Sequence, residues 1–272
     1  MENMKKTLGF FGAGKMAEGI VQAVQAAGGK SLFAHVVMGE AQPVRAREMA
    51  RRYGVQVTSD LALVARSAGV LFLAVRPQDV AAVAAAVKPH LTARKLLVSI
   101  CAGKSLAALR RAFGPKVRLV RVMPNLCLRA REGMCAICAG ANATSADVKL
   151  VSATLAAAGR TAVLKEKDFD AVTALSGSGP AFFAYMEQAM AQGGEKLGLK
   201  PEVARLLAEQ TMLGTAAYLR ASGADLGTFI AGVATKGGTT AAGMDVLSKS
   251  DFASVVADTL AAAAKRSKEL GK

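Results

Sequence analysis

The pattern of apolar and polar residues divides the 272-residue chain into two parts, which meet at about residue 165. In the first part, short apolar runs alternate with stretches of helical periodicity. One run, VLFLAV at 70–75, is apolar at every position, as in strands buried on both faces. Strands are predicted at 6–11, 33–38, 70–75, 96–101 and 117–122, and helices at 15–27, 43–53, 78–87 and 106–113. This alternation predicts a parallel sheet covered by helices.

The second part has no strand pattern and predicts helices only. Pro180 and Pro201 stand where helices should begin, a position that suits proline because its fixed φ is helical. Helices are predicted at 180–197, 201–221, 239–247 and 252–269. We therefore expect a doubly wound α/β domain at residues 1–165, followed by an all-helical domain at residues 166–272.

A glycine-rich segment, GAGKMA at residues 12–17, joins the first predicted strand to the first predicted helix. Gly12 permits a tight turn, Gly14 allows close approach of a pyrophosphate, and Ala17 is small where the helix crosses the strand. The phosphates of a dinucleotide then lie among the unpaired amides at the helix N-terminus. The segment predicts a dinucleotide-binding Rossmann-like domain. Because a predicted strand precedes the segment and a predicted helix follows it, a simple glycine-rich turn is the weaker interpretation.

The residues after the second strand leave the choice of dinucleotide open. Glu40 is suited to the ribose hydroxyls of NAD, because an acidic residue at this place accepts hydrogen bonds from them. Arg45 and Arg47 lie on the following helix, within reach of the 2′-phosphate of NADP. Alternatively, these arginines lie on a solvated helix face.

Two further strand ends are candidate cofactor contacts. Residues 74–77, AVRP, end one strand, and residues 99–103, SICAG, end the next. Ligands bind outside the carboxyl ends of strands in open α/β sheets, and small residues there leave room for a nicotinamide. On the pattern alone, an ordinary passage from strand to loop is an equally good interpretation.

The segment TKGGTTAAG at 235–243 is the most informative part of the helical half. Two glycines followed by two threonines open a helix, so backbone amides and the helix dipole favour a carboxylate there. The segment SGSGP at 176–180 is a second Gly/Ser turn at a helix start. In both segments the hydroxyl groups either contact a substrate or cap the helix.

Charge and cysteines add few constraints. The formal net charge is +15, and residues 1–165 hold 24 Lys and Arg against 8 Asp and Glu. The basic residues are not interleaved with aromatic residues, and the sequence has no recognisable nucleic-acid-binding motif. Nucleic acid is therefore disfavoured as a partner. Cys135 and Cys138 form a CxxC without a second pair of metal ligands, so we expect buried free thiols on strands and no metal site.

The sequence also carries expectations about location. No apolar stretch approaches the roughly 20 residues that span a bilayer. The apolar run near the start breaks after four residues at Gly12 and is followed by no cleavage-site pattern, which favours a first strand over a signal peptide. We therefore expect a cytoplasmic protein that does not associate with membranes.

Taken together, these segments resemble the pyrroline-5-carboxylate reductase family. The resemblance covers nearly the whole chain and preserves the order and spacing of the family's motifs. ALSGSGPAF and KGGTTAAG are its most specific parts, whereas the glycine fingerprint is shared by many families. The matching pieces are GFFGAGKMA, LFLAVRPQ, SICAG, RVMPN, REG at 131–133, ALSGSGPAF and VATKGGTTAAGM.

The resemblance implies a Rossmann domain followed by a helical dimerisation domain that intertwines with a partner subunit, as a homodimer or a ring of dimers. It implies NADPH or NADH as the cofactor and the small molecule pyrroline-5-carboxylate as the substrate. The implied cofactor contacts are Phe11, Gly12, Ala13, Gly14, Lys15, Met16, Gly39, Ala74, Val75, Arg76, Pro77, Ile100, Cys101 and Ala102. The implied substrate contacts are Ser176, Thr235, Gly237, Gly238, Thr239 and Thr240, and Thr240 matches the threonine whose hydroxyl faces the imine nitrogen.

The implied reaction is the last step of proline biosynthesis, in which the C=N carbon of the cyclic imine takes up a hydride. An iminium is already electrophilic, so the protein mainly positions the two reactants, in keeping with a sequence that has no candidate catalytic histidine. A β-hydroxyacid dehydrogenase needs a general base, and the helix opening at Pro180 carries no lysine until Lys196. A non-catalytic dinucleotide-binding relative is the other alternative. It rests on departures from the family pattern, such as Leu61, Leu126-Cys127 and Gly232.

Overall fold

The computed structural model describes residues 6–27 and 32–271. The chain forms two compact units, one of residues 1–178 with 263–272 and the other of residues 179–262. Each unit is described by itself. The domain boundary predicted at 165/166 stays a prediction.

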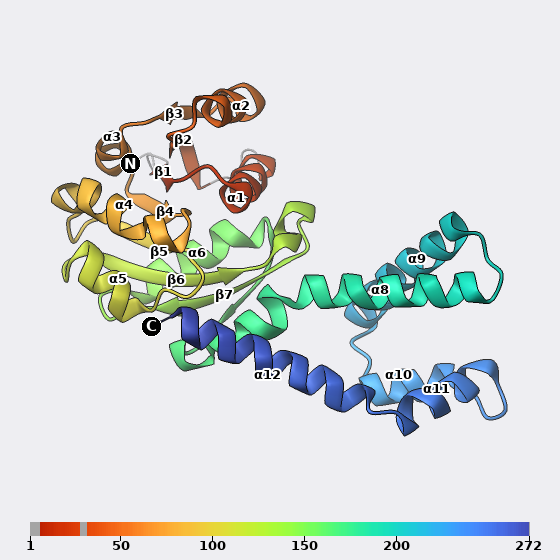
Figure 1. Cartoon of the computed structure of the whole chain (residues 1–272). Coiled ribbons are helices and arrows are strands. Elements are labelled where there is room, and N and C mark those ends of the chain that lie inside the picture. Colours follow the sequence, from red (N-terminus) through yellow and green to blue (C-terminus); the bar gives the residue numbers. More distant parts are fainter. Residues whose placement is uncertain (1–5, 28–31, 272) are drawn as a thin grey trace. The chain divides into compact units, whose positions relative to one another are not determined.

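An eight-stranded sheet forms the centre of the first unit (Figure 1). Its strand order is β3-β2-β1-β4-β5-β6-β7-β8, and every neighbouring pair is parallel except β6 and β7. The order reverses direction beside β1, where doubly wound sheets bind ligands. The strands are β1 (Lys6–Phe11), β2 (Phe33–Gly39), β3 (Gln56–Thr58), β4 (Val70–Leu73), β5 (Leu96–Ser99), β6 (Arg118–Pro124), β7 (Gly133–Ala139) and β8 (Gly159–Val163).

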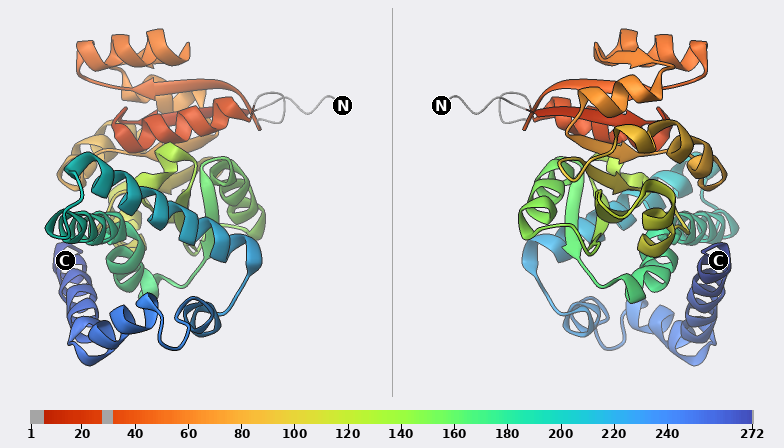
Figure 2. Two further views of the ribbon diagram at one scale, coloured as in Figure 1. Left: turned by 90° about the vertical axis from the view of Figure 1, so that its right-hand side faces the viewer. Right: turned by 90° about the vertical axis from the view of Figure 1, so that its left-hand side faces the viewer.

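Helices cover both faces of this sheet, as the two views of Figure 2 show. Alternate strand residues point to opposite faces, so Phe10 and Phe72 stack on one side with ring centroids 5.3 Å apart, while Leu71 and Leu73 pack on the other. The first core includes residues of α1, α2 and α6, and the second includes residues of α3, α4 and α5. These helices are α1 (Lys15–Ala26), α2 (Pro43–Tyr53), α3 (Leu61–Ser67), α4 (Val80–Val87), α5 (Leu106–Phe113) and α6 (Ser145–Ala156).

The chain continues through α7 (Phe169–Val172) and a π-helical turn, Thr173–Gly177, into the second unit. In that unit, α8 (Gly179–Lys196) and α9 (Pro201–Ser222) form a helical hairpin. A Cβ on Gly194 would lie 3.3 Å from the Cβ of Ala204, so small residues allow the two helices to approach closely. The remaining helices are α10 (Leu226–Val233), α11 (Thr239–Lys249) and α12 (Phe252–Leu270), of which α12 ends in the first unit.

The fold class predicted from the sequence is confirmed: a Rossmann-like sheet is followed by helices. The prediction of buried free thiols on strands holds for Cys135 and Cys138, which lie on β7. The run 70–75 ends as a strand at Leu73, two residues earlier than predicted. Among the described residues, no helix combines the length and apolar character needed to cross a membrane.

Candidate functional site

The carboxyl ends of β1, β2, β4 and β5 lie side by side and bring most of the expected cofactor contacts together. Parallel pairing aligns these ends, and the chain leaving each strand remains bonded to its neighbour. The backbone hydrogen bonds run from Gly12 N to Gly39 O at 2.8 Å, from Ala74 N to Phe11 O at 2.9 Å, and from Ile100 N to Leu73 O at 3.1 Å. The structure therefore gathers these four segments at one edge of the sheet.

The glycine-rich turn has the geometry that its sequence predicts. Gly12 has a φ of 97°, and a Cβ there would lie 2.7 Å from the carbonyl oxygen of Ala74, so only glycine fits. A Cβ on Gly14 would meet no atom of the described residues within 4 Å, which leaves the space beside its backbone open. Ala17 is fully buried against the first core. This turn fits a dinucleotide pyrophosphate.

The start of α1 offers amides to an anion. Its N-cap is Gly14, which has no side chain to cap the helix. The first helical bond runs from Glu18 N to Gly14 O at 2.9 Å, so the amides of residues 15–17 precede it. Lys15 is exposed beside them, whereas Met16 is half-buried and packs toward the core. A phosphate group beside these amides also gains from the helix dipole.

The expected contacts after β4 and β5 differ in exposure. Ala74 and Val75 are half-buried, while Arg76 is exposed and its Nε donates to Asp79 at 2.9 Å. Pro77 opens a short 3-10 helix. Ala102 is exposed, and Ile100 is buried. Ala74, Val75, Arg76 and Ala102 thus keep some surface toward solvent at this edge of the sheet.

Cys101 plays a structural part at this edge. Its thiol donates to the carbonyl oxygen of Val75 at 3.2 Å and lies 3.5 Å from that of Leu73. Burial raises the pKa of the Cys101 thiol to about 11. The group is therefore a neutral thiol at neutral pH and joins the ends of β4 and β5 rather than acting as a nucleophile.

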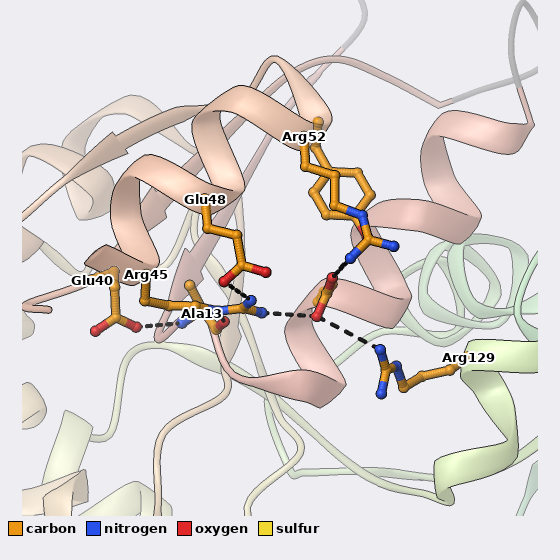
Figure 3. A network of polar contacts seen from close by, with 8 residues as sticks. Ala13, Glu40, Arg45, Glu48, Arg52 and Arg129 are labelled. Atoms are coloured by element: carbon orange, nitrogen blue, oxygen red, sulfur yellow. Dashed lines mark hydrogen bonds and ion pairs between the residues drawn. The ribbon is translucent and has the colours of Figure 1, made fainter. Parts of the chain in front are cut away.

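A polar network surrounds the glycine-rich turn (Figure 3). Glu40 follows β2, and its two carboxylate oxygens accept from the amides of Ala13, at 3.2 Å, and Gln42, at 2.9 Å. Arg45 on α2 donates from Nε to the carbonyl oxygen of Ala13 at 2.8 Å. One residue of the turn thus contacts both an acidic and a basic side chain.

Glu18 in the first turn of α1 is the centre of this network. Its side chain is 5% exposed and accepts from Arg45 at 2.9 Å, Arg52 at 3.1 Å and the hydroxyl of Tyr53 at 2.8 Å, with Arg129 at 4.0 Å. Burial alone would raise the pKa of Glu18, but the hydrogen bonds from Arg45 and Tyr53 and the charges of Arg45 and Arg52 outweigh it. The pKa of Glu18 is therefore held below its ordinary value of 4.5. The network joins α1 to α2 beneath the glycine-rich turn.

We expect Glu18→Ala to lower the free energy of unfolding by roughly 3 kcal/mol at neutral pH, because it strips a buried partner from Arg45. Because folding lowers the pKa of Glu18, this stabilisation is present above about pH 4.5 and is lost as the pH falls through the folded value. Urea unfolding of Glu18→Gln and the unaltered chain should therefore converge in acid. The control is Glu48→Ala, which removes a 44% exposed partner of the same arginine and should cost below about 1 kcal/mol. Equal losses for Glu18→Ala and Glu48→Ala would contradict this account.

Ser176 belongs to the first unit and lies next to the end of β6. It forms part of the π-helical turn, a kind of segment that often occurs at functional sites. Asn125, the residue after β6, donates to the Ser176 hydroxyl at 3.5 Å and accepts from the amide of Met134 at 3.1 Å. Since β6 is parallel to β5, Ser176 lies at the same edge of the sheet as the cofactor contacts.

The expected substrate turn lies in the second unit. Thr235 to Gly238 form a β-turn, closed by a hydrogen bond from Gly238 N to Thr235 O at 2.9 Å. Gly237 has a φ of 75°, and a Cβ on Gly238 would lie 2.9 Å from the Thr235 hydroxyl. The turn therefore requires a glycine at Gly237, whereas a side chain at Gly238 would require the Thr235 hydroxyl to move.

The start of α11 leaves its first amides and hydroxyl groups available. The N-cap is Gly238, and the first helical bond is the one from Ala242 N to Gly238 O at 3.2 Å. The amides of residues 239–241 precede this bond. Thr239 and Thr240 are exposed, and within the described chain neither hydroxyl caps the helix. Ligand contact by these two hydroxyl groups stays a prediction.

Comparison with known proteins matches the whole chain. Residues 166–270 match the model described as "Pyrroline-5-carboxylate reductase dimerisation", and residues 7–103 match "NADP oxidoreductase coenzyme F420-dependent". The chain is 39% identical to pyrroline-5-carboxylate reductase of Pisum sativum over 97% of this chain and 96% of the relative. It is 35% identical to that of Methanosarcina acetivorans over the full length of both. The chain belongs to the pyrroline-5-carboxylate reductase family.

Solved structures of pyrroline-5-carboxylate reductases agree with this family assignment. The Coxiella burnetii structure has a TM-score of 0.93 and 29% identity, and covers 98% of this chain and 99% of its own. The Plasmodium falciparum structure, with NADP bound, has a TM-score of 0.86 and 28% identity, and covers 99% of each chain. The oxidoreductase class predicted from the sequence is confirmed with the family.

Three residues of this pyrroline-5-carboxylate reductase family member escaped the sequence analysis. The sequence does offer a signal for Glu18, because this charged residue lies next to the buried, apolar positions of helix α1, which packs on the sheet. Asn125 was noted only as part of RVMPN, and its link to Ser176 depends on contacts far apart in the sequence. Arg129 approaches Glu18 from a separate 3-10 helix, and no local pattern predicts this.

Proposed function

We propose that this chain reduces 1-pyrroline-5-carboxylate to proline, with NADH or NADPH as the reductant. The observation that carries this proposal is the full-length similarity to proteins named pyrroline-5-carboxylate reductase, at 35–39% identity. In this reaction the bound cofactor supplies a hydride to the imine carbon, and the ring nitrogen takes up a proton. The protein has to hold, orient and shield the reactants.

We assign cofactor binding to the first unit. The glycine-rich turn and the amides of residues 15–17 would bind the pyrophosphate, because they present open donors at a helix N-terminus. The contacts proposed for the rest of the cofactor are Phe11, Gly39, Ala74, Val75, Arg76, Pro77, Ile100, Cys101 and Ala102. Most of these residues line the carboxyl ends of neighbouring strands.

We assign substrate binding to the turn of the second unit, and Ser176 of the first unit stays a proposed substrate contact. The amides of residues 239–241 and the turn from Thr235 to Gly238 would hold the substrate carboxylate, since they combine free donors with a helix dipole. Thr240 would orient or protonate the ring nitrogen through its hydroxyl. Our functional division of the chain stays at residues 1–165 for the dinucleotide and 166–272 for substrate and assembly.

The rival oxidoreductase is a β-hydroxyacid dehydrogenase, which oxidises an alcohol with the help of a general base. A solved 3-hydroxyisobutyrate dehydrogenase of Mycobacterium tuberculosis has a TM-score of 0.53 and 15% identity, so it shares the fold alone. Helix α8 carries no lysine before Lys196, at its last residue. Assays of imine reduction and of 3-hydroxy acid oxidation, each with both cofactors, separate the two. Alcohol oxidation without imine reduction would overturn the proposal.

The chain self-associates through its helical half, which matches the dimerisation model. Large apolar side chains of the second unit are exposed in the single chain, including Phe183 at 64%, Leu206 at 64% and Val246 at 71%. A partner subunit would bury them and so stabilise the assembly. We expect at least a dimer, and propose either a dimer or a ring of dimers, in cytoplasmic surroundings. Light scattering at micromolar concentration should report twice the chain mass or more; the mass of a single chain would contradict this.

A further inference from the structure

The polar network around the glycine-rich turn bears on which dinucleotide this chain selects. The reaction is equally possible with NADH or NADPH, which differ by one phosphate on the adenosine ribose. In doubly wound sheets the residue after the second strand lies at that ribose. Here β2 ends at Gly39 and the next residue is Glu40.

Glu40 is fixed in place rather than free to turn away. Each of its carboxylate oxygens accepts one backbone amide, Ala13 at 3.2 Å and Gln42 at 2.9 Å. Each oxygen keeps a further lone pair, which a ribose hydroxyl can use. A 2′-phosphate in the same place would meet a negative charge that can move only by giving up two hydrogen bonds. The anchored carboxylate therefore favours a free ribose.

Arg45, the nearest candidate for a phosphate clamp, already has a partner at each guanidinium nitrogen. Nε donates to Ala13 O at 2.8 Å, one terminal nitrogen to Glu48 at 2.7 Å and the other to Glu18 at 2.9 Å. Figure 3 shows Arg45 held between Glu48 and the backbone of Ala13. These bonds use three of its five N–H donors, and a movement of Arg45 toward a phosphate would cost the bond to Glu18, which is buried. Arg47 is exposed, and its Nε donates to Pro43 O at 3.3 Å, within its own helix.

We propose that Glu40 is the specificity-determining residue for the cofactor, and that Glu18 and Glu48 assist by holding Arg45 away from a phosphate, so that this chain selects NADH over NADPH. This inference rests on the proposed function only in that both require a dinucleotide at the glycine-rich turn. It names which of the two dinucleotides the site takes and why.

The test is isothermal titration calorimetry of the full-length protein with NADH and with NADPH, without substrate. The unaltered chain should bind NADH at least about ten-fold more tightly than NADPH. Glu40→Gln keeps the size and removes the charge, so it should reduce that ratio by about ten-fold, mainly through tighter NADPH binding. Glu48→Gln loosens Arg45 and should reduce the ratio by a smaller factor, roughly three-fold.

Glu209→Gln, on an exposed position of α9, makes the same charge change in the second unit and should leave the ratio unchanged. Equal or tighter binding of NADPH by the unaltered chain overturns the inference, as does an unchanged ratio in Glu40→Gln. These outcomes leave the proposed function intact. Failure to bind either dinucleotide would overturn both.

Discussion

Replacing Gly14 by valine is expected to weaken NADH binding roughly 100-fold, which corresponds to about 2.7 kcal/mol. The described part of the protein has room for the new side chain, because a Cβ at Gly14 meets none of its atoms within 4 Å and the backbone there is extended, with a φ of −68°. The added atoms would occupy the space in which a pyrophosphate approaches the start of α1. Titration calorimetry measures the affinity, and thermal unfolding should show only a small loss, on the order of 1 kcal/mol at the N-cap.

Gly69→Val is the matched control for this substitution. Gly69 also has open space for a Cβ, and its φ lies outside the left-handed region. It precedes β4, at the amino end of the sheet, whereas the proposed site lies at the carboxyl ends. Gly69→Val should therefore bind NADH like the unaltered protein. Normal binding by Gly14→Val would show that the dinucleotide does not lie at this turn.

Thr240→Ala is expected to lower kcat/KM for imine reduction by roughly ten-fold or more, since a hydrogen bond made in the transition state is worth at least about 1.4 kcal/mol. The N-cap of α11 is Gly238 and no side chain of the described residues caps the helix, so loss of this hydroxyl should leave the melting temperature nearly unchanged. Steady-state kinetics at saturating cofactor measure the effect. Substitution by serine, which keeps the hydroxyl, should restore most of the rate.

Thr239→Ala is the control at the neighbouring position. Thr239 is also exposed in the first turn of α11, and we propose that it contributes through its backbone amide, which alanine retains. Its loss of activity should therefore be much smaller than that of Thr240→Ala. Equal, small losses in both variants together with lowered melting temperatures would favour a role in capping the helix.

The sequence predicted those parts of the fold whose local signals are strong. The first strand, the glycine-rich turn and α1 follow from adjacent residues, because Gly12 needs a positive φ and Ala17 needs to be small. Pro201 and Gly223 mark the two ends of α9 in the way that helix boundaries predict. These features depend on the chemistry of a few neighbouring residues and are visible without the rest of the molecule.

The sequence did not delimit the elements with weak local signals, although Cys135 and Cys138 were expected on strands. Strand β7 reads GMCAICA, and its small residues form a strand because β6 and β8 flank it and bury it. Strand β3 has three residues and, among the described strands, pairs only with β2. The sequence analysis predicts no helix between 221 and 239, but Leu226–Val233 forms α10, which begins where the Asp225 side chain accepts from Thr228 N at 3.0 Å. That capping signal was present and was overlooked.

The residues of the candidate site also divide into those that the sequence predicts and those that it does not. The turn at Thr235 and the glycines after β1 were predictable, because each performs its task through its own backbone. The choice between Glu40 and Arg45 stayed open in the sequence, because it depends on Glu18, 27 residues away from Arg45 in the chain and brought to it by the packing of α1 and α2. Ion pairs between residues far apart in the chain leave no periodic pattern in the sequence, so the sequence alone does not predict them.

The central claim, that this chain transfers a hydride from a nicotinamide to a cyclic imine, is tested most directly with a labelled cofactor. NADH that carries deuterium at the transferable C4 position is mixed with 1-pyrroline-5-carboxylate and the full-length protein, and the product is analysed by mass spectrometry and NMR. The account predicts proline with one deuterium at the ring carbon that was doubly bonded to nitrogen, formed in step with NADH oxidation. Unlabelled proline, or no proline while both ligands bind, would contradict it.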